Sequence, residues 1–162
     1  MIRHAILGLG SNVGGAAPLA EAVERCRALP GSELIRCSAV YLSAPWGGVA
    51  GGRFRNAALL LATALAPWDL LAATRRIELA LGRRRGPRAA PRTIDIDLLW
   101  YQGARLELPA LQVPHPRLLE RRFALLPLCE IAPDAVLAPG LRAAAALARC
   151  ADRGAVWRCY SL

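Results

Sequence analysis

The sequence contains no lysine, so all 21 of its cationic side chains are arginines. A phosphate-binding loop of the Walker type ends in a lysine followed by serine or threonine, and the lack of lysine excludes that type of nucleotide site. No apolar run reaches the roughly 18 residues that a membrane-spanning helix needs. The first residues also lack the pattern of a signal peptide, so we expect a cytoplasmic protein that folds as one domain over residues 1–162.

The cysteines are few and scattered, and no two of them form a C-x-x-C pair. Their odd number argues against a disulfide framework, and their spacing does not match that of a zinc site. We therefore expect reduced thiols that fill small apolar spaces. The positions are Cys26, Cys37, Cys129, Cys150 and Cys159.

The positive charge is concentrated in one stretch of the chain. The formal net charge is +9, and the segment from Arg75 to Arg92 holds seven arginines but one acid, Glu78. Genome composition can explain a high total of arginine, but it does not explain this clustering. A concentrated positive field attracts a polyanion such as a nucleotide, a nucleic acid or a membrane surface.

The hydrophobic pattern predicts strands and helices in the order β-α-β-β-α-β over the first hundred residues. The expected strands cover 2–9, 34–43, 54–63 and 93–101, and the expected helices cover 18–29 and 67–81. That order is ferredoxin-like, which makes the fold α+β with helices packed on an antiparallel sheet. Further helices are expected over 123–131 and 141–150, with short strands over 106–108 and 155–160.

The strongest local signal is the run from Pro91 to Leu99, which contains Asp95 and Asp97. Side chains alternate between the two faces of a strand, so these two carboxylates point to the same side. Oxygen ligands of this kind suit Mg²⁺, which also takes phosphate oxygens, and two ions can share such a pair. The alternative is the solvated outer face of an amphipathic strand, although aspartate is disfavoured in strands.

The arginine-rich segment lies directly before this strand, and arginine binds phosphate through two parallel hydrogen bonds. A paired-carboxylate metal site beside a cationic loop is what phosphoryl transfer from MgATP requires. His115 lies between two prolines, where it could donate to a phosphate or be a structural histidine in a rigid turn. Gly8 and Gly10 are interpreted as a tight turn after the first strand rather than as a nucleotide contact.

Five segments resemble the 6-hydroxymethyl-7,8-dihydropterin pyrophosphokinase family, and they are spread over most of the chain. They are Leu9-Gly10-Ser11-Asn12, Asn56-Ala57-Ala58, Arg76-Ile77-Glu78, the run Pro91-Arg92-Thr93-Ile94-Asp95-Ile96-Asp97, and Val113-Pro114-His115-Pro116. The combination of the last two is highly specific.

The resemblance implies that the chain moves the pyrophosphate of MgATP onto the hydroxymethyl group of the pterin and releases AMP, in folate biosynthesis. It implies two Mg²⁺ ions on Asp95 and Asp97, with Arg83 and Arg92 as further catalytic residues. The expected partners are the small molecules ATP and hydroxymethyl-dihydropterin, with no nucleic acid and no membrane. The expected protein is a monomer.

The resemblance also implies two sets of binding residues. The ATP-binding set is Glu78, Arg83, Arg85, Arg88, Arg92, Leu98, His115 and Arg121. The pterin-binding set is Ser43, Ala44, Trp46, Phe54, Asn56 and Phe123. A flat polar heterocycle is held by aromatic stacking and an amide that reads its edge. For Phe54 and Phe123, ordinary core packing is the alternative.

The sequence departs from the family at two positions, Ala89 and Ala90, where a tryptophan is common. The arginine segment is also slightly short, and Arg75 stands where a glutamine is frequent. A rival function is an RNA-binding module, which the ferredoxin-like order and the basic charge both allow. RNA-binding sheets of that type display aromatic residues on their central strands, whereas this chain carries glycines and paired acids there.

Overall fold

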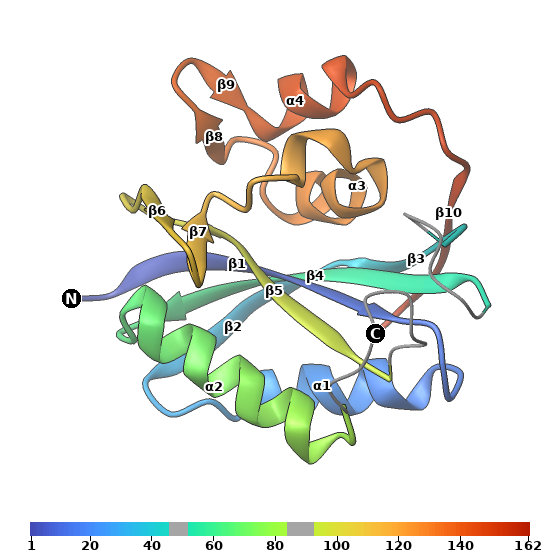
Figure 1. Ribbon diagram of the computed structural model, residues 1–162, viewed down its shortest axis with the longest axis horizontal. Helices are drawn as coiled ribbons and strands as arrows, with labels where there is room; N and C mark the ends of the chain where they lie inside the picture. The colour runs from blue at the N-terminus through green and yellow to red at the C-terminus, as the bar shows by residue number, and fades with distance from the viewer. Residues whose placement is uncertain (46–51, 84–92) are drawn as a thin grey trace.

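The structure is a computed structural model that describes residues 1–45, 52–83 and 93–162. A twisted sheet runs through the middle of the molecule, with α1 (Ala17–Arg27) and α2 (Pro67–Ala80) on one face and α3 (Arg122–Ile131) and α4 (Ala143–Arg149) on the other (Figure 1). In the described ranges, no helix is long and apolar enough to cross a membrane. The expected α+β class is therefore confirmed at the level of an antiparallel sheet with four helices.

In the described part of the chain, the main sheet has six strands, and all of their pairings are antiparallel. Its order is β10-β3-β4-β1-β5, and β2 also pairs with β4. The bounds are β1 Arg3–Ser11, β2 Ser32–Cys37, β3 Ala39–Ser43, β4 Phe54–Thr63, β5 Asp95–Tyr101 and β10 Val156–Ser161.

Two sequence predictions about strands were wrong. Gly8 and Gly10 do not end the first strand, because β1 continues to Ser11 and pairs with both β4 and β5 along that stretch. The expected strand over 34–43 is two strands separated at Ser38. The Ser38 hydroxyl donates to the Ala39 carbonyl and accepts from the Ala58 N–H, so it satisfies backbone groups where the strand breaks.

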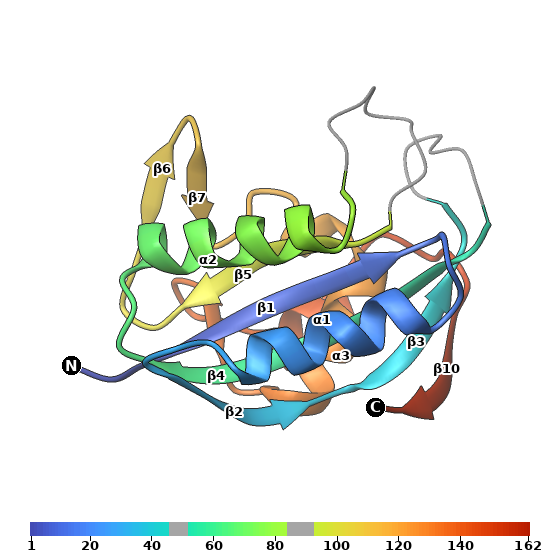
Figure 2. The ribbon, with the colours of Figure 1, turned by 90° about the horizontal axis from the view of Figure 1, so that it is seen from below.

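The helices on the first face begin and end where the sequence predicted, to within two residues. Proline occupies the first turn of α1 and of α2, where a missing N–H costs nothing. Gly82 follows α2 with a φ of +83°, a conformation that favours glycine at a helix C-terminus. Figure 2 shows α1 and α2 lying side by side over the sheet.

Strand alternation gives the molecule two apolar cores, one on each side of the sheet. Leu7, Leu59 and Ile96 point toward α1 and α2, whereas Ile6 and Leu99 point toward α3 and α4. Each face of the sheet is therefore covered by helices. Polar residues and glycines on these inner faces are exceptions to the apolar pattern, and they mark the candidate site.

The last third of the chain adds small elements that the sequence pattern only partly predicted. β6 (Leu106–Leu108) pairs with β7 (Leu111–Val113), and β8 (Val136–Ala138) pairs with β9 (Leu141–Arg142). A 3-10 turn covers Leu118–Glu120. The helix expected from residue 141 begins at Ala143, because the two residues before it pair with β8.

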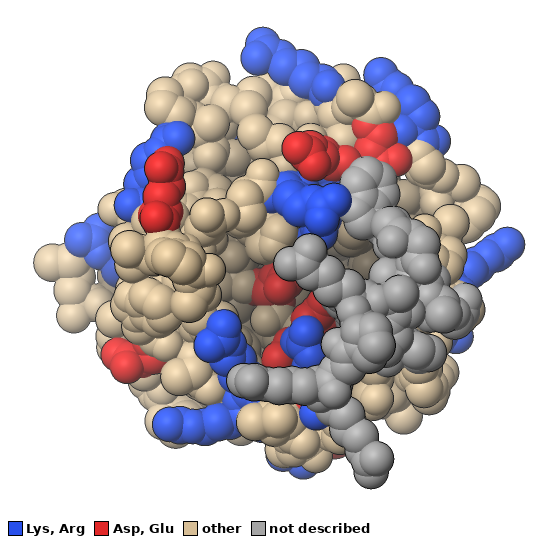
Figure 3. Space-filling view, viewed as in Figure 1, with Lys and Arg blue, Asp and Glu red and all other residues tan. Residues whose placement is uncertain are grey.

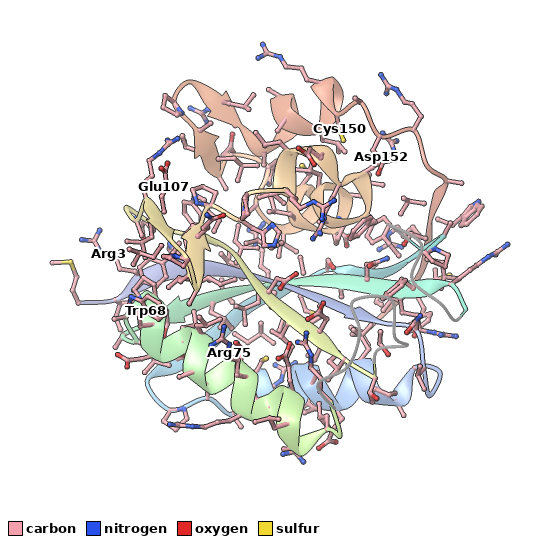
Figure 4. All side chains as sticks on the ribbon, in the orientation of Figure 1. Arg3, Trp68, Arg75, Glu107, Cys150 and Asp152 are labelled. Atoms are coloured by element: carbon pink, nitrogen blue, oxygen red, sulfur yellow. The ribbon has the colours of Figure 1, made fainter. Side chains whose placement is uncertain are left out.

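Asp152 fixes the start of α3 from a distance in sequence. Its Oδ2 accepts from the N–H of Arg122, the first residue of the helix, at 3.1 Å, and its Oδ1 accepts from the Gly154 N–H at 2.8 Å. Figure 4 labels Asp152 and Cys150 on the segment between α4 and β10. All five cysteines carry free thiols, and Cys26 and Cys150 are buried.

A polar contact between α3 and β3 joins the second helical layer to the sheet. Glu130 accepts from the Tyr41 hydroxyl at 2.7 Å and from the Ala39 N–H at 3.1 Å. Burial alone would raise the pKa of Glu130, but these hydrogen bonds and the nearby Arg158 hold it below its ordinary value of 4.5. The stabilisation from ionised Glu130 is therefore present above that value and is lost as the pH falls through the lowered pKa.

Replacing Tyr41 with phenylalanine should lower the free energy of unfolding by about 1.5–3 kcal/mol at pH 7, because a hydrogen bond to a charged group is lost. At pH 3 the difference from the native protein should shrink, because a larger fraction of Glu130 is protonated there than at pH 7. Urea unfolding at both pH values measures this. The exposed Tyr160, replaced in the same way, serves as control. An equal deficit at pH 7 and pH 3 would contradict the role given to Glu130.

Candidate metal and phosphate site

The candidate site lies where several strand ends meet at one end of the sheet. In register, Asp95 of β5 faces Gly10 of β1, and Gly10 in turn faces Asn56 of β4. Asp97 faces Gly8 in the same way. In Figure 3, acidic and arginine side chains lie next to each other in a hollow of this face of the molecule. Three strands therefore contribute to one row of residues across this face.

The predicted alternation along β5 is confirmed. Ile96 and Leu98 are buried in the core under α1 and α2, with 3% and 4% exposure. Asp95 and Asp97 are partly buried and lie on the opposite face of the strand. Because alternate residues along a strand are about 7 Å apart, the two carboxylates can reach a shared pair of ions.

The two glycines of β1, which face the aspartates, border different surroundings. A Cβ added at Gly10 would lie 3.7 Å from Asn56 Oδ1 and 3.7 Å from Phe54 Cδ1. A Cβ at Gly8 would lie 2.8 Å from Leu99 Cδ1, which is too close without movement of Leu99. Sequence reasoning assigned a tight turn to these glycines, whereas in the structure Gly10 leaves room beside Asn56 and Phe54, and Gly8 makes room for the Leu99 side chain.

Glu78 is a buried carboxylate on α2 that supports β5 from its outer side. β5 is the end strand of the sheet in the part of the chain that the structure describes. Glu78 Oε1 accepts from the Ile96 N–H at 2.6 Å and pairs with Arg83. The side chain of Glu78 is only 7% exposed. Among the described residues, its hydrogen-bond and ion-pair partners are therefore the backbone N–H between the two aspartates and an arginine.

Arg83 connects Glu78 to the aspartate pair. Its Nη1 contacts Glu78 Oε1 and lies 2.6 Å from Asp95 Oδ1. Burial raises the pKa of Glu78 above its ordinary value, while the Ile96 hydrogen bond and the charge of Arg83 oppose that rise and favour the ionised form. Burial would lower the pKa of Arg83, but Asp95 and Glu78 outweigh it and raise that pKa above its ordinary value.

His115 enters the site from the segment after β7, where the Val113–Pro114 bond is cis. The backbone N–H of His115 donates to the Leu99 carbonyl at 2.9 Å. The ring nitrogen Nδ1 accepts from the backbone N–H of Arg117 at 3.2 Å. Burial, followed by the charge of Arg121, lowers the pKa of His115 to about 4. A neutral imidazole that accepts at Nδ1 carries its proton on Nε2, so the ring offers one N–H donor.

Arg121 and Phe123 lie together at the start of α3. The Arg121 guanidinium carbon is 5.8 Å from the centre of the Phe123 ring, which is a cation–π arrangement. Both side chains are partly buried. The aromatic ring is therefore held next to a cation rather than deep in the core.

Asn56 is almost fully buried, and its orientation is set by hydrogen bonds. Its Nδ2 donates to Ser43 Oγ at 2.9 Å, to the Tyr41 carbonyl at 3.2 Å and to the Phe54 carbonyl at 3.4 Å. With the amide nitrogen committed to these acceptors, Oδ1 points toward the space above Gly10. The site therefore presents a fixed acceptor beside the partly buried Phe54 ring.

Ser11 is a site-supporting residue whose role sequence reasoning missed. It is fully buried, and its hydroxyl lies 2.5 Å from the Thr93 carbonyl and 3.1 Å from the Val13 carbonyl. It thereby joins the end of β1 to the residue two positions before Asp95. The signals in the sequence were a polar side chain at the end of an apolar strand and its place in the family-like segment Leu9-Gly10-Ser11-Asn12.

The side chains of some predicted site residues are not among those that the structure brings together. The Leu98 side chain packs in the core, so a contact with ATP would have to come from its backbone, while Ala44 is exposed at the end of β3. Four more lie outside the described residues: Trp46, Arg85, Arg88 and Arg92.

The donor set fits a magnesium site that relies on substrate oxygens. In residues 1–45, 52–83 and 93–162, no group of three or more histidine, cysteine, aspartate or glutamate side chains is placed to hold a metal. Magnesium keeps several waters and is commonly bound by one or two carboxylates together with substrate phosphates. Asp95 and Asp97 supply that kind of incomplete set.

Comparisons with known proteins agree on one family. A family model described as 7,8-dihydro-6-hydroxymethylpterin-pyrophosphokinase (HPPK) matches residues 6–133. The chain is 48% identical to the 2-amino-4-hydroxy-6-hydroxymethyldihydropteridine pyrophosphokinase of Methylorubrum extorquens, over 84% of this chain and 87% of that one. It is 40% identical to the protein of the same name from Pseudomonas aeruginosa, over 95% and 96%.

A solved structure shares the fold at low sequence identity. It is that of Plasmodium falciparum HPPK-DHPS with pteroate, with a TM-score of 0.74 and 14% identity. The match covers 92% of this chain and 42% of that longer one. At this identity the likeness concerns the fold alone.

The surroundings of His115 generate a direct test. Its imidazole should stay neutral from pH 7.5 to pH 5.5 and titrate with a midpoint of about 4. The NMR chemical shifts of the ring protons, recorded against pH, measure this titration. A His4→Gln variant leaves His115 as the single histidine. Because the pKa is lowered on folding, the unfolded chain binds the proton first, and His115 should favour unfolding as the pH falls below 6.5. A midpoint at 6.5 would show that the ring is not buried as described.

Proposed function

The chain belongs to the 7,8-dihydro-6-hydroxymethylpterin-pyrophosphokinase family, and from that premise we propose that Asp95 and Asp97 hold the magnesium of ATP at the reacting phosphates. The protein is an ATP-dependent pyrophosphokinase of folate biosynthesis. It transfers pyrophosphate from ATP to the hydroxymethyl group of 6-hydroxymethyl-7,8-dihydropterin, and AMP leaves. The observation that carries the site is the placing of both carboxylates on one face of β5, opposite two glycines.

Asp95 and Asp97 are the residues that would hold two Mg²⁺ ions. When bound, such ions neutralise phosphate charge and hold the attacking hydroxyl and the leaving oxygen in line. Glu78 contributes by fixing the backbone between them through the Ile96 N–H. Its burial supports a positioning role rather than direct contact with the nucleotide.

The phosphate contacts come from donors that surround the aspartates. We assign this role to Arg83, Arg121 and the Nε2–H of His115, which the low pKa of the ring keeps neutral at pH 7. A neutral donor orients a phosphate oxygen without adding charge, while the guanidinium groups offset the charge that develops during transfer. Arg85, Arg88 and Arg92 complete the proposed set from the sequence resemblance.

The pterin would occupy the space above Gly10. Asn56 Oδ1 would accept from the N–H groups at the edge of the ring, since its own amide nitrogen is committed to the protein. Phe54 and Phe123 would contact the two faces of the ring, with Ser43, Ala44 and Trp46 at its rim. The absence of a Cβ at Gly10 leaves room for a flat ring at this position.

We also propose the finer features that go with this function. The strand order β3-β4-β1-β5, with α1 and α2 packed on one face, supports a ferredoxin-like core. Paired acids on the opposite face disfavour a phosphate backbone there, which supports small-molecule substrates over nucleic acid. A cytoplasmic monomer without a membrane partner stays our expectation.

Replacing Asp95 or Asp97 with asparagine should reduce AMP formation at least about a hundredfold, because each change removes an anionic ligand from the reacting centre. Thermal unfolding should change by only a few degrees, since both side chains are partly exposed. The rate is measured with MgATP and hydroxymethyl-dihydropterin.

The matched control is Asp134→Asn, which changes an 81% exposed side chain paired on the surface with Arg142 and should keep native activity. Near-native turnover in either Asp95→Asn or Asp97→Asn would refute the metal assignment.

Replacing Asn56 with alanine should raise the KM for the pterin by roughly tenfold or more while the KM for ATP stays within about twofold, because one oriented acceptor is lost. Steady-state kinetics with each substrate varied in turn measures the split. Ser32→Ala, which removes a 2.6 Å hydrogen bond to Thr63 at the other end of the sheet, controls for loss of a buried polar contact. Equal changes in both KM values would indicate a structural role alone.

A further inference from the structure

One guanidinium nitrogen is shared between two acids at the centre of the site. Arg83 Nη1 contacts Glu78 Oε1 and lies 2.6 Å from Asp95 Oδ1. The side chains differ in exposure, at 34% for Arg83, 16% for Asp95 and 7% for Glu78. The arginine therefore lies between a buried acid and an acid that faces the substrate space.

The contact with Asp95 uses a carboxylate that also has to bind metal. Magnesium binds carboxylate oxygen at about 2.0–2.1 Å, so an ion on Asp95 would lie within a few ångströms of the guanidinium. Two cations so close repel each other strongly when the surroundings are partly buried. Asp95 cannot satisfy both of them fully.

Glu78 gives the arginine a second position that does not compete with the metal. Its carboxylate is held by the Ile96 N–H and is buried beside β5, so it cannot follow an ion into the substrate space. An arginine that lost Asp95 would still be paired with Glu78. The displaced guanidinium would then remain next to the phosphates instead of moving into bulk solvent.

We propose that Arg83 is the resident counter-ion of the aspartate pair, which the incoming metal displaces from Asp95 while Glu78 retains it. This inference rests on the proposed metal site at Asp95 and Asp97. It makes metal binding and the release of Arg83 a single coupled event. Arg83 lowers the affinity of the empty site for metal and then serves the bound phosphates.

If the proposal holds, removing the charge of Arg83 strengthens metal binding but slows AMP formation. Arg83→Met should tighten the binding of Mn²⁺, in the absence of nucleotide, by about fivefold or more, which is the usual scale of coupling between two sites. The same variant should form AMP more slowly than the native enzyme. An arginine that only contacts phosphate would slow the reaction without changing metal affinity in nucleotide-free protein.

The experiment counts free Mn²⁺ by electron paramagnetic resonance during titration of nucleotide-free protein. Arg149→Met removes the same charge from the exposed end of α4 and should leave the affinity unchanged. Arg83→Lys keeps the cation and should bind Mn²⁺ as the native protein does or less than twofold tighter. Repeating the titration at about 0.3 M salt removes the contribution of distant exposed charges, and the tightening should persist.

Glu78→Gln tests the second half of the proposal. Of the two acids that Arg83 contacts, this variant leaves Asp95 as the charged one. The guanidinium then competes more strongly with the metal for Asp95, so Mn²⁺ binding should weaken. The double variant Glu78→Gln/Arg83→Met removes both charges of the buried pair and should again bind more tightly than Glu78→Gln alone. It also covers the case in which the single Arg83 variant fails to fold because Glu78 is left unpaired.

The outcomes separate this inference from the proposed function. If Asp97→Asn weakens Mn²⁺ binding but Arg83→Met leaves it unchanged or weaker, the counter-ion role is wrong and the metal site stands. If Asp97→Asn binds Mn²⁺ like the native protein, the metal site itself is wrong, and the inference falls with it. Tightening in Arg83→Met together with weakening in Glu78→Gln is the result that supports the proposal.

Discussion

The hydrogen bond from the Ile96 N–H to the buried carboxylate of Glu78 is the interaction on which the site depends. It occupies a backbone donor of an end strand, between the two aspartates that we assign to metal binding. It also keeps a negative charge in a place where Arg83 can pair with it. A helix on one face of the sheet thus controls the geometry of carboxylates that face the other side. In the proposed site, Glu78 thus positions other residues without an exposed surface of its own.

The rest of the site follows from the two-faced character of the sheet. Apolar residues of β1 and β5 point toward α1 and α2, so the alternate positions face α3, and there the chain has glycines and aspartates. Gly10 leaves room over the sheet, and Asn56 and Phe54 border that room on one side while Asp95 and Asp97 of β5 border it on the other. Ser11 and Asp152 hold the segments that carry Asp95 and Phe123.

Sequence reasoning predicted the strands and helices of the core well, because their hydrophobic periods are strong and proline or glycine marks their ends. It also predicted that Asp95 and Asp97 share a face. It misjudged Gly8 and Gly10, since glycine in a strand looks like a break unless the neighbouring strands are known. Its assignment of Glu78 to the ATP-binding set stays a prediction, and a charged residue in a motif did not reveal that the side chain is buried. Contacts such as Ser11 with Thr93 depend on tertiary structure and leave no periodic signal.

The central claim is that two carboxylates on one strand assemble a two-ion centre for pyrophosphate transfer. Crystals grown with Mn²⁺ and a non-hydrolysable analogue of ATP, measured for anomalous diffraction, test it most directly. The account predicts two anomalous peaks roughly 3.5–4 Å apart, with ligands from both Asp95 and Asp97. A single peak, or ions held only by the phosphates and away from β5, would contradict it.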